Sequence, residues 1–327
     1  MERRNLLGSI ALLSAAWSTR AWADAPGGIY RIGTLNAGPL IADNSPHGAA
    51  FLRGLSRYGY IPGKNIAFER RGADLQAKRL PELVKALAAD KVDVIVTGGF
   101  PPAIAAKQAT TLPVVAIFSG DPVGTGLVDS LARPGGNITG ISDVSAEVTP
   151  KRLELLKEFA PALRKVAVLW NADDLGMTLR YRASEAGARA LGIGVQAVGV
   201  REPENFDQAF AAMTNDKPDA ILMVADALTT LNRKRVIEFA AAHRLPAIYE
   251  FDFIARDGGL MSYGPDLDES WGRVAGLVDR ILKGAKPAEL PFEEPRLFRF
   301  VLNLKTAKSL GLNVPQSMSM RADEVIE

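Results

Sequence analysis

Short apolar runs rich in β-branched residues alternate along the chain with longer stretches in which apolar residues recur at helical spacing. Residues 80–87 illustrate the helical kind, with leucine or valine at positions 80, 83, 84 and 87. Near-continuous apolar strands separated by helices are typical of parallel sheets that helices cover on both faces. The pattern predicts a doubly wound α/β fold with strands at Ile29–Leu35, Asn65–Glu69, Val92–Thr97, Val114–Phe118, Val166–Trp170, Val195–Val200, Ala220–Val224 and Ala247–Tyr249.

This alternation occurs twice. One series runs from Ile29 to about Ile141, and a second begins at Lys165. Between them, the turn-rich residues 133–140 indicate the approach to a hinge, and Thr149-Pro150 is expected to open a new helix.

A second glycine-rich stretch, residues 257–264, indicates another crossing that returns the chain to the first lobe. The helix predicted at Leu267–Lys283 follows it. About 300 residues exceed what one hydrophobic core usually serves, so we expect two lobes.

Polar residues follow the predicted strands at the places where a ligand would bind, because open parallel α/β sheets bind ligands beyond the carboxyl ends of their strands. Eight of these residues are candidate ligand-binding residues: Asn36, Thr97, Gly98, Ser119, Asp121, Asn171, Asp226 and Glu250.

Most candidates also have a purely structural interpretation. Backbone N–H groups after Thr97-Gly98 could receive a carboxylate or form an ordinary strand-to-helix turn. Ser119 and Asp121 suit helix capping as well as contact, and Asn171 could cap a turn. Asp226 is expected to meet an ammonium group unless it is a surface-loop carboxylate.

Aromatic residues would supply apolar contact area for the ligand. Tyr263, at the second crossing, is the ninth candidate and is expected to stack on the ligand, with Phe100 as a further contact. Phe118 and Trp170 each end an apolar strand and are expected to point into the lobes, whereas Phe51 is expected in the core.

The residue types offer little for catalysis. The chain has no cysteine, which excludes thiol chemistry and cysteine-bound metal. His47 and His243 lack partners at metal-ligand spacing, and hydrolase, phosphate-loop and dinucleotide motifs are absent. We therefore expect no enzyme activity, no catalytic residue, no metal and no cofactor. A hydrolase using Asp121 and Asp226 as an acid–base pair is the remaining enzymatic alternative.

The N-terminal residues resemble a secretory signal peptide: Arg3 and Arg4 precede a short apolar run, and Ala21-Trp22-Ala23 supplies small residues for cleavage. We expect residues 1–23 to be removed, by either the general or the twin-arginine export route. Removal leaves equal numbers of basic and acidic residues, so charge does not favour a nucleic-acid partner. Without a cysteine there is no lipid anchor, and a soluble periplasmic protein is predicted.

Several long motifs resemble ABC-transporter substrate-binding proteins related to the tryptophan-binding (TrpX) type. They occur in order along nearly the whole mature chain and comprise residues 121–128, 131–140, 258–264, 281–287, 303–308 and 321–326.

The resemblance implies a type I periplasmic binding protein, with two doubly wound parallel-sheet lobes joined by a three-crossing hinge. The first lobe would comprise residues 24–142 and 264–288, and the second 143–263 and 289–327. The third crossing is expected near Lys286–Pro295. The implied partners are a small solute and an inner-membrane ABC permease with its cytoplasmic ATPase. The solute classes considered are an aromatic or apolar amino acid and a related carboxylate. We expect a monomer. A ligand sensor that feeds a membrane receptor is the alternative.

Overall fold

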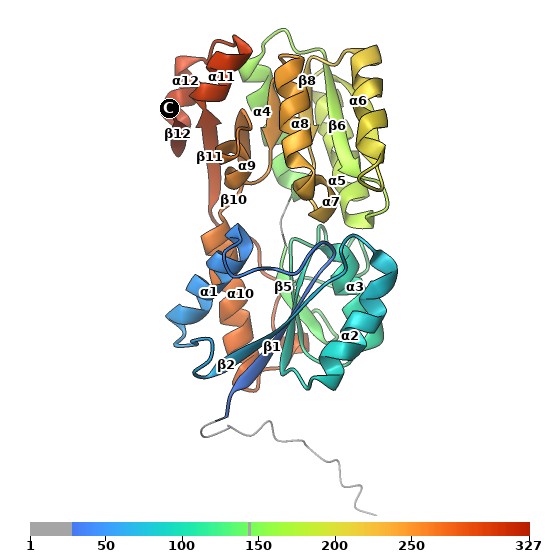
Figure 1. Cartoon of the computed structure of the whole chain (residues 1–327), viewed down its shortest axis with the longest axis vertical. Helices are drawn as coiled ribbons and strands as arrows, with labels where there is room; N and C mark the ends of the chain where they lie inside the picture. Colours follow the sequence, from blue (N-terminus) through green and yellow to red (C-terminus); the bar gives the residue numbers. More distant parts are fainter. Residues whose placement is uncertain (1–27, 143–144) are drawn as a thin grey trace, which may run out of the picture.

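The computed structural model describes residues 28–142 and 145–327, the side chains of residues 145–147 excepted. The signal peptide predicted at residues 1–23 lies outside the described residues. The described residues form two α/β lobes stacked end to end (Figure 1). No helix in this part of the chain is long and apolar enough to cross a membrane.

The first lobe is built on a five-stranded parallel sheet in the order β2-β1-β3-β4-β5. Its strands are β1 (Tyr30–Asn36), β2 (Ile66–Gly72), β3 (Val94–Gly98), β4 (Val114–Ile117) and β5 (Ile138–Ile141).

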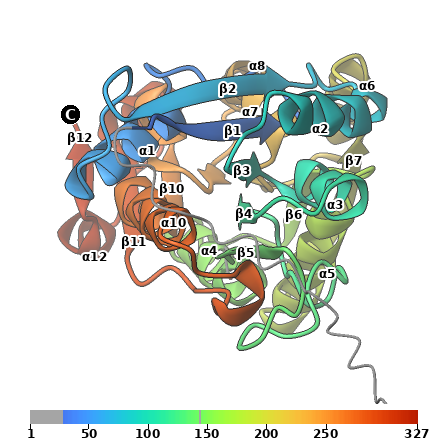
Figure 2. The same cartoon turned by 90° about the horizontal axis from the view of Figure 1, so that it is seen from below.

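Helices cover both faces of this sheet, as Figure 2 shows. Val94 and Val96 pack on the face covered by α1 (Pro46–Arg57) and α10 (Leu267–Leu282), whereas Ile95 packs on the opposite face. That face is covered by α2 (Leu80–Ala89), which the short 3₁₀ turn η1 (Ala77–Arg79) precedes, and by α3 (Phe100–Ala109). Successive strand residues point to opposite faces, so a continuous apolar run serves both cores.

The second lobe holds a seven-stranded sheet in the order β12-β11-β10-β9-β8-β6-β7. All neighbouring strands are parallel except β10 and β11. Its strands are β6 (Lys165–Asn171), β7 (Gly194–Val200), β8 (Ala220–Met223), β9 (Ala247–Tyr249), β10 (Met261–Pro265), β11 (Phe298–Asn303) and β12 (Glu324–Ile326).

Its helices again lie on both faces of the sheet (Figure 1). Leu222 packs in one core with α4 and α5, and Ile221 packs in the other with α6 and α8. The helices are α4 (Ser145–Phe159), α5 (Leu175–Ala190), α6 (Asn205–Asp216), α7 (Ala227–Leu231), α8 (Arg233–Ala242), α9 (Asp252–Arg256), α11 (Leu304–Leu310) and α12 (Gln316–Arg321).

The chain passes between the lobes after β5, between β10 and α10, and before β11. These connections run side by side: the N–H of Ser142 donates to the carbonyl of Glu293 at 2.8 Å, and the N–H of Asp266 donates to that of Leu297 at 2.9 Å. The turn η2 (Pro287–Glu289) and the side chains of Leu290 and Phe292 still pack in the first lobe.

The two doubly wound lobes predicted from the sequence are confirmed, and the eight predicted strands lie within a few residues of observed ones. Four strands, β5, β10, β11 and β12, were not predicted. Strand β5 lies partly in the stretch 133–140, which was assigned to a hinge approach because it is rich in turn residues, Gly140 among them. In the sheet, a Cβ on Gly140 would lie 2.0 Å from the carbonyl oxygen of Ala116, so packing requires the glycine. Helix α4 begins at Ser145, earlier than the predicted start at Thr149-Pro150.

Candidate ligand-binding site

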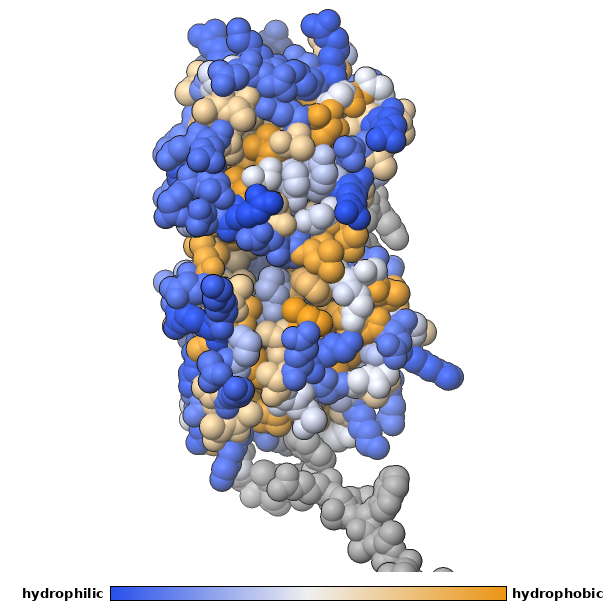
Figure 3. Space-filling view, turned by 90° about the vertical axis from the view of Figure 1, so that its right-hand side faces the viewer, coloured by the Kyte–Doolittle hydropathy of each residue, from blue (hydrophilic) through white to orange (hydrophobic). Residues whose placement is uncertain are grey.

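A cavity of about 410 Å³ lies between the lobes, beyond the carboxyl ends of their strands. This volume lies in the range of small-molecule sites. The first lobe contributes the loop after β1, the start of α1, the start of α3, Phe118 and Trp271. The second lobe contributes the segments after β6, β8 and β9. Figure 3 shows hydrophobic residues bordering the waist between the lobes on both sides.

One end of the cavity is aromatic. Its ring cluster contains three residues of the first lobe and two of the second, which are His47, Phe118, Trp271, Phe251 and Phe253. The ring centroids of His47 and Phe251 lie 5.6 Å apart, and those of Phe118 and Phe251 lie 5.1 Å apart, so the cluster joins the lobes. Such edge-to-face pairs contribute about 0.5–1.5 kcal/mol beyond their buried area.

Two local features position these rings. Phe118 follows β4 with φ +56°, a left-handed conformation that costs a non-glycine residue about 1–3 kcal/mol and is held by surrounding contacts. Trp271 Nε1 donates to His47 Nδ1 at 3.2 Å, which leaves the ring proton of His47 on Nε2. Burial lowers the pKa of His47 to about 4, so the ring is neutral at pH 7.

The other end of the cavity is acidic. Asp226 begins α7 in a capping box, its Oδ1 accepting from the N–H and hydroxyl of Thr229, each at 2.9 Å. Its Oδ2 accepts from Asn171 Nδ2 at 2.6 Å. Asp174 caps α5 by accepting from the N–H of Met177 at 3.2 Å.

These two carboxyls resist ionisation together. Burial, and secondly the charge of Asp226, raise the pKa of Asp174 to about 7. Burial also raises the pKa of Asp226, against the hydrogen bonds from Thr229 and Asn171, which favour its ionised form. A cation placed beside them would lower both pKa values and so favour the ionised forms.

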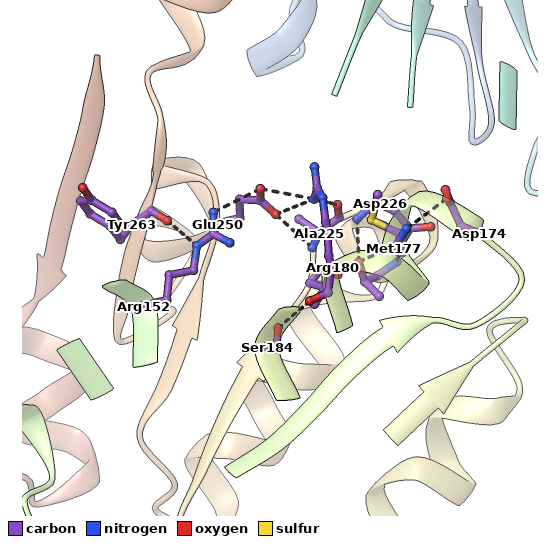
Figure 4. A network of polar contacts seen from close by, with 11 residues as sticks. Arg152, Asp174, Met177, Arg180, Ser184, Ala225, Asp226, Glu250 and Tyr263 are labelled. Carbon is purple, nitrogen blue, oxygen red and sulfur yellow. Dashed lines mark hydrogen bonds and ion pairs between the residues drawn. The ribbon is translucent and has the colours of Figure 1, made fainter. Parts of the chain in front are cut away.

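A buried ion network lies beside the acidic end (Figure 4). Glu250 pairs with Arg152 at 3.2 Å and with Arg180 at 3.1 Å, and all three side chains are almost fully buried. Glu250 Oε2 also accepts from the N–H of Ala225 at 3.2 Å. The residue before Asp226 is therefore fixed to this network.

Four of the nine residues predicted from the sequence line the cavity: Asn36, Gly98, Asn171 and Asp226. The amide of Asn36 donates to the carbonyl of Pro39 at 2.8 Å and shapes the loop after β1. Ligand contact by these four stays a prediction.

The structure places the other five outside the cavity wall. Thr97 and Ser119 are fully buried in the first lobe. Asp121 Oδ1 accepts from the N–H groups of Val123 and Gly124 and closes a turn, but no helix begins there, so the helix-capping role is wrong.

Glu250 belongs to the buried ion network, and Tyr263 lies on β10, next to a connection between the lobes. Glu250 serves Arg152 and Arg180, as described above. The ring of Tyr263 stacks 6.2 Å from that of Phe298, and its carbonyl accepts from Arg152 Nε at 2.7 Å. Figure 4 shows the ring pointing away from Asp226.

Sequence reasoning missed most of the aromatic end and the second carboxyl, Asp174. Phe118 was expected inside its lobe, but its positive φ turns the ring to the cavity. His47 was considered only as a metal ligand. It follows Ser45-Pro46, and the Ser45 hydroxyl caps α1 by accepting from the N–H of Gly48. This helix start places His47 beside the carboxyl ends of the strands. That N-cap signal was present in the sequence.

Among the described residues, no group of three or more histidine, aspartate or glutamate side chains is arranged to hold a metal ion.

Comparison with known proteins agrees with this architecture. The tyrosine-binding protein of Clostridioides difficile (strain R20291) is 26% identical over 263 residues, which are 80% of this chain and 75% of that protein. A conserved domain protein from Vibrio cholerae superposes with a TM-score of 0.85 at 25% identity, over 90% of this chain and 99% of that one. The ABC domain from Streptococcus pneumonia in complex with L-Trp gives a TM-score of 0.81 at 26% identity, over 90% of this chain and all of that one.

The sequence profile of one family, described as ABC transporter substrate binding protein, matches residues 47–326. The match spans most of the chain and agrees with the resemblance noted in the sequence. The chain belongs to the ABC transporter substrate binding protein family.

Proposed function

We propose that this protein is the periplasmic solute-binding component of an ABC importer, and that its cargo is a small aromatic compound with an amino group, an aromatic amino acid in the first instance. Residues 1–23 direct its export, and it acts as a soluble monomer. It binds its cargo without chemically changing it.

The observation that carries this proposal is the two-ended cavity. An aromatic cluster supplied by both lobes faces the body of the ligand, and Asp226 with Asn171 faces its amino group. A small number of placed polar groups in an apolar cavity is the usual basis of small-molecule specificity.

The relatives support the same cargo class. One is a tyrosine-binding protein, and another is an ABC domain in complex with L-Trp. Both amino acids combine an ammonium group with an aromatic body, which suits the two ends of this cavity.

The mechanism is closure of the lobes. A ligand that contacts both lobes stabilises the closed population, and an inner-membrane permease with its ATPase then recognises that form. The aromatic cluster couples ligand contact to closure, because His47 and Phe118 meet Phe251 across the two lobes.

Calorimetric titration of the purified protein with the natural amino acids tests the proposal. We expect tyrosine, tryptophan or phenylalanine to bind and to raise the melting temperature with concentration. Recovery of the bound compound unchanged would agree with a binding role. If no aromatic amino acid binds while sugars or aliphatic acids do, the proposed cargo is wrong.

Asp226→Ala provides the site-specific version of this test. Loss of one charged hydrogen bond, about 1.5–3 kcal/mol, should weaken an amine-bearing ligand about tenfold or more. Asp207→Ala is the matched control, because Asp207 is an exposed carboxylate on α6 paired with Arg235. Unchanged affinity in Asp226→Ala would remove Asp226 from the site.

A further inference from the structure

The charges on the cavity wall are unbalanced. Among the described residues, the charged side chains that line the cavity are three aspartates and two arginines, namely Asp173, Asp174, Asp226, Arg201 and Arg233. Residues 143–147, whose side chains are not described, contain no lysine or arginine in their sequence.

Both arginines already have partners of their own. Arg233 Nε pairs with Asp257 at 2.6 Å, and its Nη1 donates to the carbonyl of Thr230 at 2.9 Å. Arg201 pairs with Asp173 at 3.0 Å, and these side chains are 61% and 64% exposed. The Arg201–Asp173 pair therefore lies in solvent, where its charges are screened.

The other two aspartates, Asp174 and Asp226, have no arginine or lysine partner among the residues that line the cavity. Asp174 is only 3% exposed, and Asp226 is bound by Asn171 and Thr229, which are neutral. Arg180 lies near Asp226 and interacts with its charge, but its side chain is only 3% exposed and pairs with Glu250, so it is not part of the cavity wall. The polar end of the cavity thus favours a cationic group.

Four of the helix starts at the cavity, those of α1, α3, α5 and α7, are also poor places for a ligand carboxylate. Helix N-termini attract carboxylates through free N–H groups. The starts of α5 and α7 already hold the carboxyls of Asp174 and Asp226.

In the first lobe, proline removes donors from the first turns of α1 and α3. Pro101 and Pro102 lie in the first turn of α3, and Pro46 starts α1. The N–H of Gly48 is used by the Ser45 hydroxyl. The carboxylate site expected after Thr97-Gly98 therefore lacks most of its donors.

We propose that the ligand's ammonium group alone supplies the polar recognition, so that the cavity takes aromatic amines that lack a carboxylate at least as well as the corresponding amino acids. The preferred class is the 2-arylethylamines. This inference rests on the proposed function, since it concerns the same cavity and the same acidic end.

Matched ligand series test it on the wild-type protein. Calorimetry would compare L-tyrosine with tyramine and 3-(4-hydroxyphenyl)propionate, and L-tryptophan with tryptamine and 3-indolepropionate. The expected result is that each amine binds as tightly as its amino acid or up to about tenfold more tightly, and that neither acid binds measurably.

The outcomes separate the two claims. If the amino acids bind and their amines bind more weakly, the carboxylate is recognised and this inference is overturned, while the proposed function stands. If only the acids bind, or if no compound of the series binds, the ammonium site is wrong and both claims fail.

Variants locate the effect within the site. Asp174→Asn and Asp226→Asn each remove one negative charge and keep a side chain that can cap a helix. Each should weaken tyramine about tenfold and weaken tyrosine less, so the amine loses its advantage. Asp207→Asn makes the same change in an exposed pair on α6 and should leave both affinities unchanged. Equal affinity of tyramine for all three variants and the wild type would contradict the inference.

Discussion

At the residue scale, Asp174 combines a structural role with an electrostatic cost. It caps α5, yet it is buried beside Asp226, and its pKa is raised to about 7 from an ordinary 3.8. The folded protein therefore keeps a proton that the unfolded chain releases between about pH 4 and 7. By linkage, this residue makes the free energy of unfolding fall as pH rises through that window.

His47 has the opposite effect on the pH dependence of the free energy of unfolding. Its pKa is lowered to about 4 from 6.5, so between these values the unfolded chain binds the extra proton. Its contribution makes the free energy of unfolding rise with pH over that range. The two effects oppose each other below about pH 6.5, and a variant is needed to separate them.

Asp174→Asn isolates the aspartate. Asparagine can cap the helix without titrating, so the variant should gain stability relative to the wild type as pH rises from 5 to 8. One pKa unit corresponds to about 1.4 kcal/mol, and we expect a relative gain of at least about that size. Urea unfolding of both proteins without ligand at each pH measures it. A constant stability difference across this range would mean that Asp174 does not titrate there.

At the element scale, Glu250 at the end of β9 connects several parts of the second lobe. It pairs with Arg152 of α4 and Arg180 of α5 and accepts from the backbone after β8. Arg152 extends the connection to β10 by donating to the carbonyl of Tyr263. Because β10 leads into a connection between the lobes, this network links the acidic end of the cavity to the hinge.

Glu250→Gln should therefore destabilise the protein. Removing one partner of a buried ion network leaves uncompensated charge, and we expect the free energy of unfolding to fall by about 3–5 kcal/mol. Glu82→Gln, in an exposed pair with Lys85, is the control and should change it by less than about 1 kcal/mol. Urea denaturation would compare the two. Equal stability of both variants would show that the network is dispensable.

The sequence predicted those strands that carry a clear local pattern of apolar residues. The strand at Val114–Phe118 was predicted because the run is apolar throughout, and the observed strand Val114–Ile117 is buried along its whole length. Strand β12 has only three residues, and β10 lies in a glycine-rich stretch, so neither shows a pattern of its own. Packing against β9 and β11, which no local pattern reports, determines them.

The same distinction applies to the site. The acidic end follows strand ends, so Asn171 and Asp226 could be named from the sequence. Only the helix start before His47 had a local signal in the sequence. The rest of the aromatic end could not be predicted, because its residues come from distant parts of the chain and meet only after both lobes fold and approach each other.

At the scale of the whole molecule, the lobes touch through glycines beside the cavity. A Cβ on Gly120 would lie 3.1 Å from the Cα of Gly176 at the start of α5. A Cβ on Gly176 would lie 3.2 Å from the carbonyl oxygen of Ser119 and 3.4 Å from the Cβ of Phe100. Ser119 and Phe100 belong to the first lobe, so any side chain at position 176 presses on the opposite lobe.

Gly176→Val should therefore oppose closure, because its methyl groups would press on the first lobe, while valine is accepted in a helix at least as well as glycine. A Cβ at this position would also lie 3.2 Å from Oδ1 of Asp174 in its own lobe, so the scattering measurement is the one that reports closure itself. If the extra methyl groups disfavour the closed form by about 1.4 kcal/mol, ligand affinity falls about tenfold. Small-angle scattering should show ligand-induced compaction of the wild type and reduced compaction of the variant. Gly136→Val is the control, because a Cβ there meets nothing within 4 Å. Wild-type affinity and compaction in Gly176→Val would mean that the glycine contact does not limit closure.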